Sequence, residues 1–144
     1  MRAWTWAAGL TLSVCLLEGC SQQAAATDDL IHALSESHSA IASSVLAIRL
    51  YAQHRSTRAA TETVLGDMAG QIVDAERALE PVKIDSTQLQ SDRDAALAAI
   101  HAGVAALLTS RDELQRHGTV GSAAGLESAG GQVDGVLGEL RGSR

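Results

Sequence analysis

Apolar residues recur along this sequence at alternating intervals of three and four, and this spacing constrains the fold more than any other feature. The first such seam consists of Ile31, Leu34, His38, Ile41, Val45, Ile48 and Ala52, widened by Leu30, Leu46 and Leu50. The second consists of Thr61, Leu65, Met68, Ile72, Ala75 and Leu79. An α-helix brings residues three and four apart onto one face, so each segment is expected to bury that face against other helices. The pattern predicts an all-α protein.

Capping residues and a proline divide the pattern into separate helices. Thr27, followed by Asp28 and Asp29, has the character of an N-cap with acids in the first turn, which predicts the start of the first helix. The polar stretch 54–57 predicts a break after it. Pro81 predicts that the second helix ends near residue 79, because proline disfavours helical geometry in the residue before it.

A third helix is expected between Asp85 and Gly118. Asp85 and Gln88 have the spacing of a capping box, and Gly118 suits the left-handed position that follows many helices. The seam consists of Leu97, Ile100, Val104, Leu107 and Leu114. Seven alanines beside it leave little bulk, so a neighbouring helix can approach closely: Ala95, Ala96, Ala98, Ala99, Ala102, Ala105 and Ala106.

The last segment has helical spacing but is rich in glycine. Its seam is Leu126, Ala129, Val133, Leu137 and Leu140, and the glycines are Gly121, Gly125, Gly130, Gly131, Gly135 and Gly138. Each glycine inside a helix costs ~1 kcal/mol relative to alanine, so a helix over about residues 123–140 should be the least stable. The sequence therefore predicts a single antiparallel up-down four-helix bundle over residues 27–144. The alternative is a three-helix bundle with a loose tail after Gly118.

The N-terminal stretch has the pattern of an export signal. Arg2 is followed by fifteen uncharged, mostly apolar residues from Ala3 to Leu17, fewer than the ~20 that a membrane-spanning helix needs. Leu17-Glu18-Gly19-Cys20 comes next, and it resembles the lipobox of bacterial lipoproteins. Glu18 departs from that pattern, which has a small or neutral residue there. The resemblance implies a signal peptide over residues 1–19 and a lipidated Cys20 that begins the mature protein.

The same resemblance implies the location of the protein. Cys20 would carry diacylglycerol and a fatty acid such as palmitate, and residues 20–26 would form a short tether between the membrane and the bundle. The protein would then be lipid-anchored in the cell envelope on the exported side, and in the outer membrane if the source has two membranes, since Ser21 follows Cys20. The alternative is cleavage after Ala26 at the end of an alanine triplet, which would release a freely secreted helical protein.

Composition excludes several functional classes. The chain carries a formal net charge of −6, which makes it a poor candidate for nucleic-acid binding. Tyr51 is the only aromatic residue after the leader, so stacking on bases is not expected. Leader removal takes away Cys15 and lipidation occupies Cys20, which leaves no cysteine to form a disulfide or to bind a metal.

Few residues have the pattern of a catalytic or metal site. His32 and Glu36 lie four apart, a spacing that permits two metal ligands but is also common in surface contacts. Tyr51 and His54 lie three apart and could ligate haem iron, but no further aromatic residues are present to line a haem pocket. The sequence therefore predicts no catalytic residue, no metal site and no cofactor besides the lipid, and an enzyme is the least favoured class.

Basic residues gather where the connections between helices 1 and 2 and between helices 3 and 4 are expected. Arg55, Arg58 and Arg116 are the candidate contacts there for an anionic wall polymer or another envelope protein. Bases near helix ends also complement helix dipoles, which explains the same pattern without a partner. The predicted function is a non-catalytic interaction or spacer module. The alternative is a carrier of a small apolar ligand between the helices.

Overall fold

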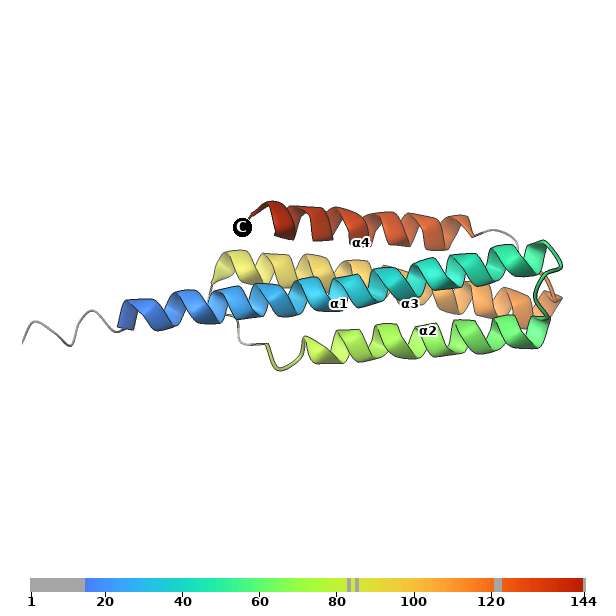
Figure 1. The fold of residues 1–144 in the computed structure, drawn as a ribbon, viewed down its shortest axis with the longest axis horizontal. Helices are drawn as coiled ribbons and strands as arrows, with labels where there is room; N and C mark the ends of the chain where they lie inside the picture. Colours follow the sequence, from blue (N-terminus) through green and yellow to red (C-terminus); the bar gives the residue numbers. More distant parts are fainter. Residues whose placement is uncertain (1–14, 83, 85, 121–122, 144) are drawn as a thin grey trace, which may run out of the picture.

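Four α-helices make up most of the chain in the computed structural model, which describes residues 15–82, 84, 86–120 and 123–143. They are α1 (Cys15–Ala52), α2 (Arg58–Ala78), α3 (Thr87–His117) and α4 (Ala124–Gly142). Successive helices run in opposite directions, so the fold is an antiparallel up-down four-helix bundle, as the spacing predicted (Figure 1). Within the described residues, no helix combines the length and apolar character that crossing a bilayer requires.

The bundle is flattened, with α1 and α3 in contact across its diagonal. Helix α1 packs against all three other helices, whereas α2 and α4 share no contact among the described residues. Figure 1 shows the consequence, with α2 and α4 on opposite sides of the α1–α3 pair. Helix α1 is therefore the central element, and α4 depends on α1 and α3 alone for its packing.

Small residues allow α1 and α3 to approach across the diagonal. A Cβ added to Gly103 on α3 would lie 2.8 Å from Cδ1 of Ile41 on α1, so no larger residue fits there without movement. Both helices bury further small residues, namely Ala33, Ser37, Ala40 and Ser44 on α1, and Ala96, Ala99 and Ser110 on α3. The buried hydroxyls of Ser37 and Ser44 each donate to the carbonyl four residues earlier, at 2.9 Å, which avoids burying an unpaired polar group.

The predicted seams of the second and fourth helices lie in the core. Except for the half-buried Met68, every seam residue of α2 is buried, and so is every seam residue of α4. Because α4 is packed in this way, the alternative of three helices with a loose tail is wrong. Most of the core leucines and isoleucines are fully buried, including Leu34, Leu65, Ile72, Ile100, Leu107 and Leu126.

Most of the predicted helix ends are confirmed. Helix α1 ends at Ala52, and Thr57 caps α2 by accepting a hydrogen bond from the backbone N–H of Ala60 at 3.2 Å. Helix α2 ends at Ala78 with Leu79 as its C-cap. Gly118 has a φ of 66° and follows α3, which is the left-handed conformation expected there.

The predicted start of the first helix is wrong. Helix α1 begins at Cys15 and continues without a break through residues 20–26, the expected tether. Thr27 is not an N-cap, because its hydroxyl donates to the carbonyl of Gln23 at 3.0 Å, one turn earlier. The alanines and glutamines before Thr27 are compatible with a helix, so the helix starts before Thr27 and continues through it.

The predicted capping box of the third helix is also wrong. Ser86 caps α3 by accepting a hydrogen bond from the N–H of Leu89 at 3.2 Å. The Gln88 side chain donates instead to Asp92 at 2.8 Å. Asp85, the predicted cap, lies outside the described residues. Asp85 and Ser86 are adjacent polar residues of types that cap helices, and the spacing does not distinguish between them.

Seam residues on two helices differ from the prediction. On α1, Leu46, expected to widen the seam, is 58% exposed, and Ala52, the last seam residue, is also exposed. On α3, Leu97 and Val104 are only half-buried, while Ala96, Ala99 and Gly103 face the core. The close approach to α1 explains the second difference, because small residues fit the diagonal contact better than branched ones.

Candidate functional site

The lipobox-like segment lies at the protruding end of α1. Cys20 is in the first turns of this helix, which extend beyond the ends of the other three helices (Figure 1). The side chain of Cys20 is not among those the structure describes, and Arg2 and most of the apolar run fall within residues 1–14, outside the described residues. The C-terminal end of α2, the start of α3 and the end of α4 lie at this same end of the bundle.

Ala26 marks where α1 joins the core. It is 5% exposed and belongs to the hydrophobic core, whereas residues 23–25 are exposed. Ala26 lies six positions after Cys20, which corresponds to about 9 Å along a helix. A lipid on Cys20 would therefore hold the bundle close to the membrane surface.

The basic residues predicted at the opposite end are brought together there, but two of the three are already engaged. Arg58 donates from Nε to Glu62 and from a terminal nitrogen to the carbonyl of Gln115, both at 2.7 Å. Arg116 forms an ion pair with Asp112 one turn earlier. Among the described residues, Arg55 is exposed and has no ion-pair partner. Arg58 thus joins α2 to the end of α3, a structural role that the sequence did not indicate.

Tyr51 and His54, the pair whose spacing could ligate haem iron, lie at the same end of the bundle. The Tyr51 hydroxyl donates a hydrogen bond to the carbonyl oxygen of Gly118, which joins the end of α1 to the end of α3. His54 is exposed in the connection between α1 and α2, with a φ of 57°. This positive φ is tolerated by histidine better than by most residues.

Two further histidines, His32 and His101, make contacts at the surface, and His38 lines a groove. His32 and Glu36, the pair with metal-ligand spacing, lie 3.3 Å apart and are both exposed. His101 on α3 contacts Glu76 on α2 at 2.8 Å. Within the described part of the chain, no group of three or more histidine, cysteine, aspartate or glutamate residues is placed to hold a metal ion.

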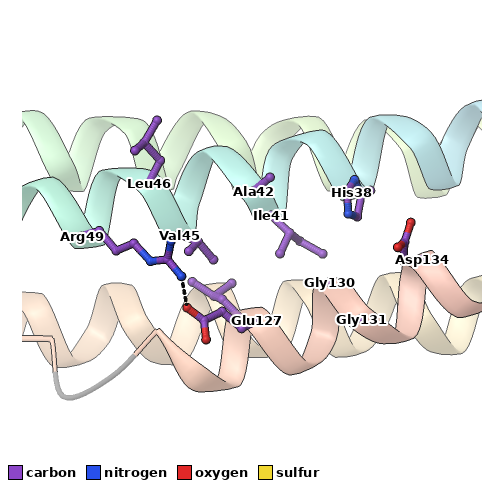
Figure 2. A pocket seen from close by; sticks show the side chains of 11 residues that line it. His38, Ile41, Ala42, Val45, Leu46, Arg49, Glu127, Gly130, Gly131 and Asp134 are labelled. Atoms are coloured by element: carbon purple, nitrogen blue, oxygen red, sulfur yellow. Dashed lines mark hydrogen bonds and ion pairs between the residues drawn. The ribbon is translucent and has the colours of Figure 1, made fainter.

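A groove between α1 and α4 is the feature that the sequence did not reveal. It has a volume of about 350 Å³, an apolar floor that includes Ile41, Val45 and Leu126, and a rim that includes Leu46. Arg49 and Glu127 form an ion pair of 2.7 Å across it (Figure 2). At the other end of the groove, His38 on α1 and Asp134 on α4 lie on opposite walls.

The α1 residues that line this groove have a regular spacing in the sequence. His38, Ala42, Leu46 and Arg49 follow one another at intervals of four, four and three, which places them along one stripe of the helix. The three-four spacing predicted His38 and Leu46 as seam residues, because a stripe beside the seam cannot be distinguished from the seam without knowing where α4 packs.

Comparison with protein-family models, with curated proteins and with solved structures finds no match for this chain.

Proposed function

We propose that this protein is a small lipid-anchored module of the cell envelope that acts without catalysis, as a spacer or as an interaction partner. The observation that carries the proposal is the segment Leu17-Glu18-Gly19-Cys20 after a short apolar run. Lipidation of Cys20 would attach the acidic bundle to a membrane at one end and leave the Arg55 end pointing away from it.

The position of Ala26 supports cleavage before Cys20 over cleavage after Ala26. Both cuts fall within helix α1, but cleavage after Ala26 would also remove the buried Ala26 side chain from the core. Cleavage before Cys20 would keep every side chain that the structure describes as buried. A buried alanine contributes little by itself, but retaining the preceding turn also keeps the helix intact at this position.

The interior of the bundle favours a spacer over a carrier of an apolar ligand. A carrier would need small residues that leave room for a ligand between the helices, but Gly103 is in close contact with Ile41. On α4, Gly125, Gly135 and Gly138 are exposed with nothing within 4 Å of an added Cβ, and Gly131 lines the open groove at the surface between α1 and α4. The small residues therefore serve close packing on α3 and lie at the surface on α4.

Fractionation of cells producing the full chain tests the proposal. Cys20→Ser should prevent incorporation of a labelled fatty acid and shift the protein from the membrane to the soluble fraction. Cys15→Ser is the matched control, because that cysteine lies in the proposed leader and its loss should change neither result. Equal labelling of the Cys20→Ser variant and the wild type would refute the proposal.

The departure at Glu18 has its own test. If a charge beside the processing site slows lipidation, Glu18→Ala should increase the fraction of labelled chain without changing the lipidated residue. Absence of label from both the wild type and Glu18→Ala would show that this segment is not processed as a lipobox.

The Arg55 end is the proposed contact with a partner such as an anionic wall polymer or an acidic protein face. The net attraction is small, because Arg58 and Arg116 already pair with Glu62 and Asp112. Arg55→Gln should therefore lower salt-sensitive retention of the chain on isolated envelope material. Retention equal to that of the wild type at low salt would refute a binding role for this end.

A further inference from the structure

The groove between α1 and α4 has walls of opposite charge. The α1 wall carries Arg49 and His38, and the α4 wall carries Glu127 and Asp134. Each base lies opposite an acid, at one end as the Arg49–Glu127 ion pair and at the other as His38 facing Asp134 (Figure 2). Among the described residues that line the groove, the basic side chains thus lie on α1 and the acidic ones on α4.

An exposed leucine stands beside the apolar floor of this groove. Leu46 is 58% exposed, and the floor next to it includes Ile41 and Val45. The neighbouring wall residues Ala42 and Gly131 are small and exposed, so they leave the surface accessible to another helix. A protruding leucine and a hollow on one surface are self-complementary, which is the property that a two-fold interface requires.

We propose that a second copy of this chain docks on the α1–α4 groove, with a two-fold axis parallel to the helices. This rotation places the α1 wall of each copy over the α4 wall of the other, so that bases meet acids at both ends. It also places each Leu46 over the α4 wall of the opposite copy, where the small residues Gly130 and Gly131 leave room for it. Arg49 and Glu127 are exposed, so each can pair with the other copy while the ion pair within the molecule is kept.

The charge pattern selects this axis over the perpendicular one. A two-fold axis across the helices would place α1 over α1 and α4 over α4, so that the acidic wall with Glu127 and Asp134 would face a second acidic wall, which is unfavourable. The parallel axis also keeps both N-terminal ends on the same side of the dimer. Two copies can therefore stand on one surface, but the dimer itself does not depend on lipidation.

Co-purification of two differently tagged full-length copies from detergent extracts tests the dimer. Capture of the first tag should recover the second, and Leu46→Asp in both copies should reduce that recovery about tenfold. Leu108→Asp is the matched control, since Leu108 is 49% exposed on α3 and lies outside the groove. Recovery should also persist with Cys20→Ser, which separates pairing from anchoring. No recovery of the second tag with the wild type, or an equal loss with Leu108→Asp, would overturn the proposal.

An exchange of charges tests the orientation. Arg49→Glu in both copies, or Glu127→Arg in both copies, places like charges on facing walls and should reduce recovery about tenfold. One Arg49→Glu copy paired with one Glu127→Arg copy restores opposite charges between the two molecules, although each molecule alone has like charges. This mixed pair should be recovered as well as the wild type. Equal recovery of all three combinations would show that these walls do not face each other.

Discussion

The hydroxyl of Tyr51 donates a hydrogen bond to the carbonyl oxygen of Gly118, sixty-seven residues later in the chain. Gly118 is the left-handed residue that ends α3. The contact therefore fixes the end of α1 against the point where the chain turns towards α4. Together with the Arg58 hydrogen bond to Gln115, it joins three helices at the end of the bundle opposite the protruding start of α1.

Tyr51→Phe should lower the free energy of unfolding by about 1 kcal/mol, because the half-buried ring is kept and one hydrogen bond is lost. Chemical denaturation followed by circular dichroism measures the change. A stability equal to that of the wild type would show that water replaces the phenol hydroxyl at Gly118 without cost.

Arg58→Gln should lower stability by about 1 kcal/mol, because it removes an ion pair and a hydrogen bond to the end of α3. Arg55→Gln should change stability by less than about 0.5 kcal/mol, since Arg55 is exposed and no ion pair involves it among the described residues. Thermal melts of the two variants provide the comparison. Equal melting temperatures would contradict the structural role of Arg58.

Glycine-to-alanine substitutions at positions 135 and 103 should change the free energy of unfolding in opposite directions. Gly135→Ala on the exposed side of α4 should stabilise the chain by about 0.5–1 kcal/mol, because nothing lies within 4 Å of the added methyl group. Gly103→Ala should destabilise it by about 1 kcal/mol, because the new Cβ would meet the buried Ile41 side chain at 2.8 Å. A gain in stability at position 103 would show that α1 and α3 separate easily.

Helix α4 should be the first helix to exchange its backbone hydrogens. It packs against α1 and α3 only, and exposed glycines weaken it. Native-state hydrogen exchange should give lower protection around Val133 than around Ile41 and Leu107. Equal protection at all three positions would mean that the bundle opens only as a unit.

The sequence predicted the number of helices, their order and most of the core because burial follows the three-four spacing directly. Every seam residue of α4, for example, is buried despite the glycines around it. Local chemistry was less decisive where two residues could perform the same role, as at Asp85 and Ser86. The predicted start of the first helix is wrong because Thr27, a residue type that often caps helices, lies inside α1, which begins at Cys15.

The groove could not be predicted because it depends on how two distant helices pack. Leu46 follows a core residue, Val45, and only the position of α4 decides that Val45 is covered while Leu46 stays exposed. In the same way, the Arg49–Glu127 pair joins residues seventy-eight positions apart. Spacing within one helix contains no information about such pairs.

The proposed anchoring of the bundle through Cys20 is tested most directly by the mass of the N-terminal peptide of protein isolated from its producing cells. We expect a chain that begins at Cys20 and carries a diacylglycerol and a fatty acid on that residue. A peptide that begins at Thr27 without lipid, or one that retains residues 1–19, would contradict it.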